Sequence, residues 1–167
     1  KITRGLSRID VGLEKEIHLG NLNSLRDWGH ARDYVEMQWM MLQQKKPADF
    51  VIATGRQESV RKFIELTAKE LNWGSIIWEG TGVNEIGRRE DTNAIVIRID
   101  EKYFRPTEVS TLLGDPTLAK KELGWVSITT LEELGAVMVK VDKEEAQKEL
   151  LLVKSGFAIN SSNEQPP

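Results

Sequence analysis

The sequence predicts an α/β fold that forms one part of a larger protein. Residues 50–53, Phe-Val-Ile-Ala, are an uninterrupted apolar run, the pattern of a strand buried on both faces of a parallel sheet. An amphipathic helix follows over residues 59–71. The other predicted strands are short, so the chain lacks the neighbours that a doubly buried strand needs. We therefore expect partner strands from outside these 167 residues.

The composition narrows the class of protein and excludes several kinds of site. Apolar residues make up 40% of the chain and charged residues 29%, which is typical of a soluble globular domain. A net charge of -3, with acids and bases mixed, gives no basic field for nucleic acid. The chain has no cysteine and only two histidines, so we expect no disulfide and no metal centre, and a cytoplasmic location. No apolar run approaches the roughly 20 residues that cross a bilayer.

The first part of the chain reads as a helix, a short extended segment and a turn. Apolar residues spaced four, three and four apart predict a helix over residues 2–13 that begins without a capping side chain. Residues 16–19 are predicted to be extended. Glycine, asparagine and serine in residues 20–24 favour a turn.

A second helix is predicted from His30 or Ala31 to Gln44, ended by Pro47. Its apolar residues occupy most of the circumference, so we expect it to be covered on more than one side. His30 lies where the helix begins. We interpret it as a packing or hydrogen-bonding residue rather than a catalytic base.

The second half contains further helix and strand signals. Ser59 is a predicted N-cap for the helix through Leu71. Short strands are predicted at residues 76–78 and 94–99. The segment between them, residues 80–93, is rich in glycine and charge, so it is predicted to be a solvated loop.

Two more helices and a tail complete the chain. Asp115, with Pro116 behind it, predicts a helix that ends near residues 123–124. Thr130 and Glu133 form a predicted capping box for a helix over residues 131–152. Residues 160–167 are polar and end in proline, so they are expected to be disordered.

Two groups of residues have the chemistry of anion binding. Arg26 lies on a loop just before a helix, where its planar fork of donors can bind a pyrophosphate. Asp27 either orients that arginine or is simply favoured near the helix N-terminus. Arg105 and Glu108 flank a proline at a spacing that allows one to bind an anion and the other to accept from sugar hydroxyls. From spacing alone, an ordinary surface ion pair between them is the stronger alternative.

Three long motifs identify a family resemblance. LGNLNSLRDWGHARDYVEMQWMMLQ, DFVIATG and YFRPTEVSTLLGDPTLAKKELGW occur in this order, and from Lys1 to about residue 141 the chain resembles the GDP-mannose 4,6-dehydratases of the extended short-chain dehydrogenase/reductase superfamily. The resemblance implies the C-terminal portion of such an enzyme. Residues 1–159 would form the small α/β substrate-binding domain together with the last Rossmann strand-helix unit, about residues 50–71, and the N-terminal Rossmann core would be absent.

The resemblance also implies a function. The family's enzymes are lyases that convert GDP-mannose to GDP-4-keto-6-deoxymannose, the first step toward GDP-fucose and related deoxyhexoses. NADP takes hydride from the sugar and returns it after water is lost, so the cofactor is not consumed. The implied partners are GDP-mannose, the protein's own N-terminal Rossmann half, and further copies in a dimer or tetramer. The isolated fragment would be inactive.

Site residues carry over from the family motifs. Arg26 resembles the pyrophosphate-binding arginine, and Arg105 and Glu108 resemble a pair near the pyrophosphate and ribose. Lys1 resembles a lysine that approaches the GDP moiety, and Asn21 lies in the loop near the nucleotide.

The resemblance places the rest of the active site outside this chain. The chain has no glycine-rich phosphate loop and no Tyr-x-x-x-Lys pattern, because Gln38 follows Tyr34 by four residues and Thr107 follows Tyr103 by four. We therefore expect no catalytic, cofactor-binding or metal-binding residue here, with NADP bound by the other half.

Two other interpretations remain open from the sequence. The chain could be a non-catalytic interaction module that retains the fold. It could also belong to a related NAD(P)-dependent dehydratase or epimerase acting on another nucleotide sugar. The apolar run at residues 50–53 favours a part of an enzyme over a separate module, because that run needs partner strands.

Overall fold

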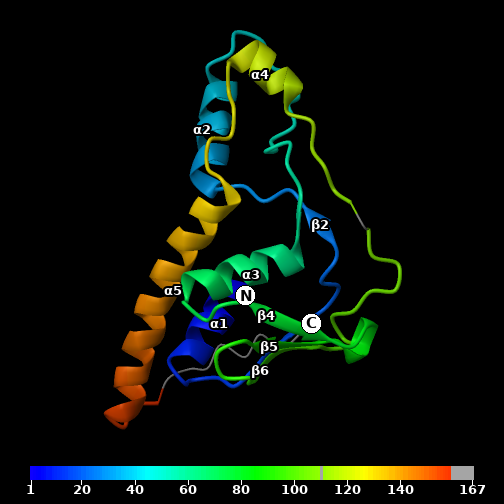
Figure 1. The fold of residues 1–167 in the computed structure, drawn as a ribbon. Coiled ribbons are helices and arrows are strands. Elements are labelled where there is room, and N and C mark those ends of the chain that lie inside the picture. Colours follow the sequence, from blue (N-terminus) through cyan, green and yellow to red (C-terminus); the bar gives the residue numbers. More distant parts are fainter. Residues whose placement is uncertain (110, 159–167) are drawn as a thin grey trace.

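The structure, a computed structural model, describes residues 1–109 and 111–158. A mixed sheet with three helices forms one end of the molecule, and two helices form the other (Figure 1). The helices are α1 (Ile2–Asp10), α2 (Ala31–Leu42), α3 (Val60–Glu70), α4 (Thr117–Leu123) and α5 (Leu131–Lys154). The predicted disordered tail, residues 160–167, lies outside the described residues.

The main sheet has four strands in the order β1-β6-β5-β4. The strands are β1 (Ile17–Leu19), β4 (Ile76–Glu79), β5 (Ile86–Arg89) and β6 (Ile95–Ile99), and a short 3-10 helix, η1 (Gly82–Asn84), precedes β5. β1 runs parallel to β6, whereas β6, β5 and β4 pair antiparallel. A separate two-stranded ribbon joins β2 (Leu25–Arg26) to β3 (Glu58–Ser59).

The predicted loop over residues 80–93 is wrong, because β5 forms inside it. The sequence did not reveal this strand, because its two adjacent arginines are typical of a solvated loop. In the structure Arg88 pairs with Glu79 and Arg89 pairs with Asp91. Gly87 packs so closely that an added Cβ would lie 2.8 Å from the ring of Trp78. Ion pairing therefore lets both arginines occupy a strand.

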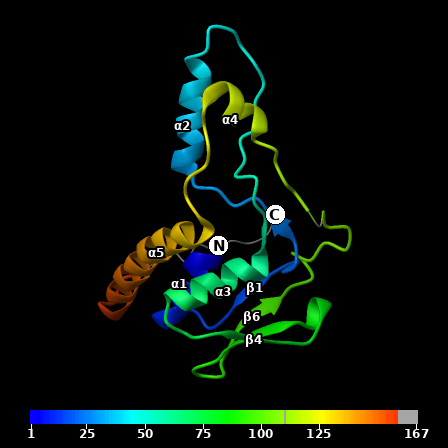
Figure 2. The ribbon, with the colours of Figure 1, turned by 45° about the horizontal axis from the view of Figure 1, so that its top comes forward.

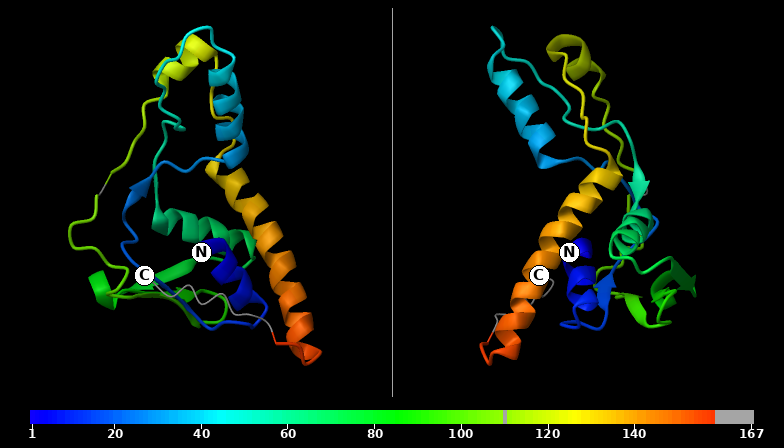
Figure 3. Two further views of the ribbon diagram at one scale, coloured as in Figure 1. Left: turned by 180° about the vertical axis from the view of Figure 1, so that it is seen from behind. Right: turned by 60° about the vertical axis from the view of Figure 1, so that its left-hand side comes forward.

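The larger core lies between the sheet and the helices. α5 packs across α1 and α3, and these two helices lie against the sheet (Figures 2 and 3). Leu6, Ile64 and Ile97 are fully enclosed. The buried residues of this cluster are Leu6, Ile17, Leu19, Leu22, Ile64, Ala68, Leu71, Trp73, Ile76, Val96, Ile97 and Val139. Their burial supplies most of the drive for folding at this end.

Several predicted helix ends are confirmed. The hydroxyl of Ser59 accepts a 3.0 Å hydrogen bond from the backbone N–H of Lys62. Thr130 and Glu133 form both bonds of the capping box. The Asp115 carboxylate accepts from the N–H of Thr117 at the start of α4. α1 has no side-chain cap, as predicted, but it ends at Asp10 rather than residue 13.

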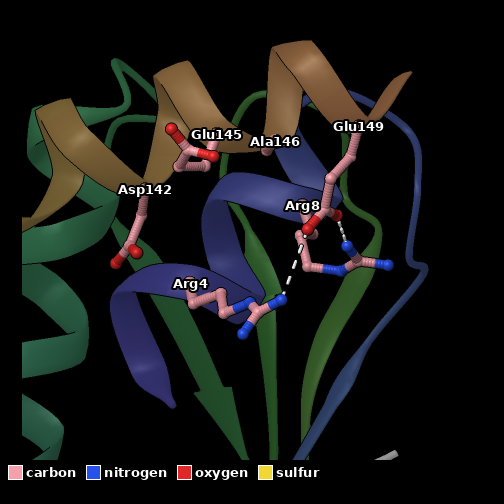
Figure 4. A pocket seen from close by; sticks show the side chains of 6 residues that line it. All are labelled: Arg4, Arg8, Asp142, Glu145, Ala146 and Glu149. Carbon is pink, nitrogen blue, oxygen red and sulfur yellow. Dashed lines mark hydrogen bonds and ion pairs between the residues drawn. The ribbon is translucent and has the colours of Figure 1, made fainter. Parts of the chain in front are cut away.

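Charged residues fasten α5 to α1 (Figure 4). The Glu149 carboxylate on α5 accepts from Arg4 at 3.3 Å and also pairs with Arg8, whose side chain is buried. Arg8 donates a second bond, of 2.6 Å, to Glu14. The hollow between the two helices is lined by Arg4, Arg8, Asp142, Glu145, Ala146 and Glu149. Because its arginines already hold carboxylates, we interpret this hollow as a structural contact.

A second, smaller cluster joins α2 to α4. Met37, Ala119, Leu123 and Trp125 form its buried centre. The expectation that α2 is covered on more than one side is wrong within this chain. Val35, Trp39 and Leu42 lie four and three residues apart, on one face of the helix, and are 60%, 62% and 82% exposed. No described residue supplies the layer that would cover this face.

Residues 50–53 form no strand in the structure. Ala53 is buried, but Val51 is 51% exposed, so the predicted burial on both faces is also absent. A strand needs a neighbouring backbone to bond with. Among the described residues none pairs with this segment, which instead connects α2 to β3.

Candidate functional site

Two segments that are far apart in sequence meet where β1 and β6 end. These strands are parallel neighbours, so the segments that leave their carboxyl ends, residues 20–26 and 100–109, start side by side. The N–H of Asp100 donates a 2.9 Å bond to the carbonyl of Leu19. Gly20 allows the close approach, because a Cβ there would lie 2.2 Å from the carbonyl oxygen of Tyr103.

Asn21 and Arg105 form a reciprocal pair across these segments. The Asn21 amide donates to the carbonyl of Arg105 at 3.0 Å, and its oxygen accepts from the N–H of Arg105 at 2.8 Å. Both hydrogen bonds use the backbone of Arg105. Arg105 is an exposed residue whose backbone is fixed by Asn21.

Arg26 and Glu108 form an ion pair between the same segments. Nη2 of Arg26 lies 2.6 Å from Oε1 of Glu108. Nη1 of Arg26 donates to the carbonyls of Leu25 at 2.8 Å and Val109 at 3.2 Å. The alternative of a local pair between Arg105 and Glu108 is not what forms among the described residues. Glu108 instead reaches across to Arg26 on β2, so the loop position predicted for Arg26 is wrong.

Lys1 joins this group through an aromatic ring. Its ammonium lies 3.6 Å from the ring centroid of Tyr103, in a cation–π contact. All of the site residues predicted from sequence therefore lie on, or contact, the two facing segments. These residues are Lys1, Asn21, Arg26, Arg105 and Glu108.

A hollow opens beside these segments. It is lined by Gly20, Asn21, Leu22, Asn23, Gly82, Glu85, Ile99 and Phe104. Arg61 closes one side, since it donates to the Asn23 side-chain oxygen at 3.1 Å and pairs with Glu85 at 2.7 Å. The sequence analysis did not single out Glu85 or Arg61, because both stand among many surface charges. The arrangement offers amide, carboxylate and aromatic groups next to exposed Arg105.

Asp27 does neither of the two things considered from the sequence. Its carboxylate accepts from the N–H of Thr54 at 2.8 Å, from the Thr54 hydroxyl at 2.7 Å and from the N–H of Gly55 at 3.0 Å. It thus holds the turn that follows residues 50–53. Burial raises the pKa of the nearby Tyr34 hydroxyl, and the Asp27 carboxylate raises that pKa further.

His30 has the role predicted for it. Its Nδ1 accepts a 3.0 Å hydrogen bond from the backbone N–H of Arg32, so the side chain caps α2. The neighbouring Trp28 stacks on Phe63, with ring centroids 4.6 Å apart. The segment between β2 and α2 is therefore anchored by α2 and α3.

Asp33 is a buried charge that the sequence analysis missed. It is 2% exposed and accepts from the N–H groups of Ile128 and Thr129 and the hydroxyls of Ser127 and Thr129. Burial alone raises the pKa of this carboxyl, but the hydrogen bonds from Thr129, Ser127 and Ile128 outweigh it and lower the pKa. The hydroxyl residues Ser127, Thr129 and Thr130, close behind Trp125, were the available signal.

A sequence model of the GDP-mannose 4,6 dehydratase family matches residues 1–138. The chain belongs to the GDP-mannose 4,6-dehydratase family. It is 53% identical to the GDP-mannose 4,6-dehydratase of Vibrio cholerae serotype O1, covering 98% of this chain and 46% of the relative. Against the Homo sapiens GDP-mannose 4,6 dehydratase it is 46% identical, covering 86% and 38%. The family predicted from the three motifs is confirmed, and the chain spans about half the length of the curated relatives it matches.

Two solved structures illustrate the similarity of the fold. The structure of RMD from Pseudomonas aeruginosa, complexed with NADPH, superposes with a TM-score of 0.67 at 16% identity, covering 86% of this chain and 41% of that one. The UDP-glucose 4-epimerase from Bifidobacterium longum gives 0.61 at 18% identity, covering 89% and 40%. At these identities the likeness shows the fold alone. It confirms the predicted α/β class for this member of the GDP-mannose 4,6-dehydratase family.

Two further properties concern the described residues of this family member. None of the helices within residues 1–109 and 111–158 combines the length and the apolarity that a membrane crossing requires. The same residues contain no cluster of three or more histidine, cysteine, aspartate or glutamate side chains that could hold a metal ion.

Proposed function

We propose that this chain is the substrate-binding half of an NADP-dependent GDP-mannose 4,6-dehydratase. The whole enzyme would convert GDP-mannose to GDP-4-keto-6-deoxymannose, the first step toward GDP-fucose and related deoxyhexoses. The observation that carries the proposal is that Arg26, Glu108 and Arg105 lie on two facing segments of a chain 53% identical to a protein of that name.

The proposed roles follow from the donor and acceptor chemistry of each side chain. Arg26 and Arg105 would donate charge-assisted hydrogen bonds to the diphosphate. Glu108 would accept from the ribose hydroxyls. Lys1 and Asn21 stand at the edge of the same segments, where Lys1 adds positive charge and Asn21 fixes the backbone of Arg105.

The residues of this chain do not fit an NADP site. The turn after residues 50–53 is held by Asp27, whose carboxylate is unsuited to a phosphate, and the chain has no glycine-rich phosphate loop and no Tyr-x-x-x-Lys pattern. We therefore assign NADP to the other half of the enzyme. When bound there, it would accept and return the hydride. The part of this chain is to bind and orient the nucleotide sugar.

The exposed apolar surface of α2 supports a contact with that other half. Val35, Trp39 and Leu42 form one exposed stripe, and the unpaired segment 50–53 runs at the same end of the molecule (Figure 1). A sheet from the rest of the protein would cover the stripe and pair with the segment. For the whole enzyme we further propose a cytoplasmic dimer or tetramer that binds neither nucleic acid nor membranes.

Calorimetric titration of GDP into the full-length protein tests the proposal. We expect Arg26→Ala and Arg105→Ala each to weaken GDP binding by about 2–4 kcal/mol, because each removes charge-assisted bonds to phosphate. Arg32→Ala, which removes an exposed arginine on α2, is the matched control and should bind GDP like the wild type. Unchanged affinity in both site variants would refute the assignment.

Two further titrations separate the alternatives left open by the sequence. UDP should bind much more weakly than GDP, and comparable binding would favour a related enzyme with another nucleotide sugar as substrate. GDP binding by the full-length protein but not by this chain alone would indicate a site completed by both halves.

A further inference from the structure

Arg26 of the proposed site is paired with a carboxylate. Oε1 of Glu108 lies 2.6 Å from Nη2 of Arg26, which is a position that a phosphate oxygen would take. The backbone carbonyls of Leu25 and Val109 accept hydrogen bonds from Nη1 of Arg26. An anion that binds Arg26 must therefore share the guanidinium with Glu108 or displace it.

Partial burial makes displacement of this carboxylate costly. The side chains of Arg26 and Glu108 are 30% and 16% exposed, so water screens the pair less than at an open surface. A ligand that takes Arg26 leaves a half-buried carboxylate in need of another donor, and an unsatisfied charged group is unfavourable.

Glu108 cannot swing far away when it is displaced. Its backbone N–H donates a 3.2 Å bond to the carbonyl of Arg105, and that same carbonyl accepts from the Asn21 side chain. Residues 100–109 are thereby tied to residues 20–26, which include Arg26. A displaced carboxylate stays next to the bound anion, where a hydroxyl pair on the same ligand can reach it.

Resting on the proposed function, we propose that Glu108 is a specificity-determining residue. Its carboxylate competes with phosphate for Arg26, so the site favours ligands that carry both a diphosphate and a vicinal diol. A nucleoside diphosphate replaces both halves of the ion pair, since its phosphate satisfies Arg26 and its ribose hydroxyls satisfy Glu108. Inorganic phosphate and pyrophosphate replace only one half and are discriminated against.

Titrations of the full-length protein with pyrophosphate, GDP and 2′,3′-dideoxy-GDP test this inference. Glu108→Gln keeps the shape of the side chain and removes its charge. We expect it to bind pyrophosphate roughly tenfold more tightly than the wild type. The wild type should prefer GDP over dideoxy-GDP by about tenfold, and Glu108→Gln should reduce that preference to about twofold.

Glu101→Gln provides a charge-matched control on the same segment, at an exposed position. It removes one negative charge near the site without touching Arg26. The inference is overturned if Glu108→Gln raises pyrophosphate affinity no more than Glu101→Gln does. It is also overturned if Glu108→Gln weakens pyrophosphate binding, because the ion pair would then only hold the two segments together.

The same titrations separate failure of this inference from failure of the proposed function. Suppose that Arg26→Ala weakens GDP binding but Glu108→Gln leaves pyrophosphate affinity unchanged. The proposed nucleotide site is then supported, and the proposed competition between Glu108 and phosphate is refuted. If Arg26→Ala leaves GDP binding unchanged, the inference is overturned, and if Arg105→Ala also leaves it unchanged, the nucleotide site is wrong as well.

Discussion

The backbone N–H of Thr129 donates a 2.9 Å hydrogen bond to Oδ2 of Asp33. This bond joins the first turn of α2 to the residues that lead into α5. Asp33 accepts three more hydrogen bonds from residues 127–129, and its own carbonyl accepts from the indole N–H of Trp125. One buried carboxylate thus fixes the connection between the two ends of the molecule.

Asp33→Asn should lower the free energy of unfolding by about 2–4 kcal/mol, because a neutral amide oxygen accepts from Ser127, Ile128 and Thr129 more weakly than the carboxylate does. Urea denaturation followed by tryptophan fluorescence measures this. Ser127→Ala removes a single hydroxyl from the same group and should cost about 1 kcal/mol. A loss for Asp33→Asn no larger than that for Ser127→Ala would show that the carboxylate contributes little.

The same carboxylate should make stability depend on acid pH. Its folded-state pKa is lowered, because hydrogen bonds from Thr129, Ser127 and Ile128 outweigh the raising effect of burial. The unfolded chain therefore binds the proton more readily, so Asp33 stabilises the fold above its ordinary pKa of about 4 and loses that contribution as pH falls further. The difference in unfolding free energy between the wild type and Asp33→Asn should shrink below about pH 4. A difference that stays constant there would contradict the lowered pKa.

Gly20→Ala should disturb the candidate site from the backbone. The added Cβ would lie 2.2 Å from the carbonyl oxygen of Tyr103, so the two facing segments must separate. We expect a loss of about 1–3 kcal/mol in unfolding free energy, together with weaker GDP binding. Gly135→Ala is the control, since its Cβ would meet Phe63 at an ordinary 3.8 Å within α5. That variant should keep or gain stability, and equal losses in both would show that crowding at Gly20 is not the cause.

Glu149→Gln should loosen α5 from α1. Arg8 is buried and would lose the charge of one of its two carboxylate partners. The expected cost is about 1–3 kcal/mol in chemical denaturation. Glu145→Gln, one turn earlier on the same helix, removes only an exposed pair with Lys148 and should change stability by less than about 0.5 kcal/mol. Equal effects would mean that the contact between α1 and α5 is mainly apolar.

Local signals were read correctly from the sequence, and the predicted strands β1, β4 and β6 are confirmed, whereas β5, β2 and β3 were missed. The caps at Ser59 and Thr130 depend on residues three positions away, so they are visible in the chain itself. β5 and the ribbon of β2 with β3 depend on distant pairing and on ion pairs such as Arg88 with Glu79. The run at residues 50–53 has the composition of a strand but no partner among the described residues.

The candidate site follows the same division. Motif resemblance selected Arg26, Arg105 and Glu108, and the structure gathers the segments that carry them. The cross-segment pairing of Arg26 with Glu108 was not foreseen, because spacing along the chain favoured Arg105 as the partner of Glu108. The role of Asp27 was misjudged and Asp33 was missed, because each accepts hydrogen bonds from backbone groups that come close only after folding.

Besides packing against α1 and α3, α5 mechanically links the two ends of the molecule. Its 24 residues make a rod roughly 36 Å long, which begins beside the Asp33 hydrogen bonds and is paired with α1 through Glu149 near its other end. A tilt of about 5° at the end beside Asp33 would swing the far end by about 3 Å. Because Lys1, the residue before α1, contacts the ring of Tyr103, a protein layer that presses on α2 has a stiff mechanical route to residues 100–109.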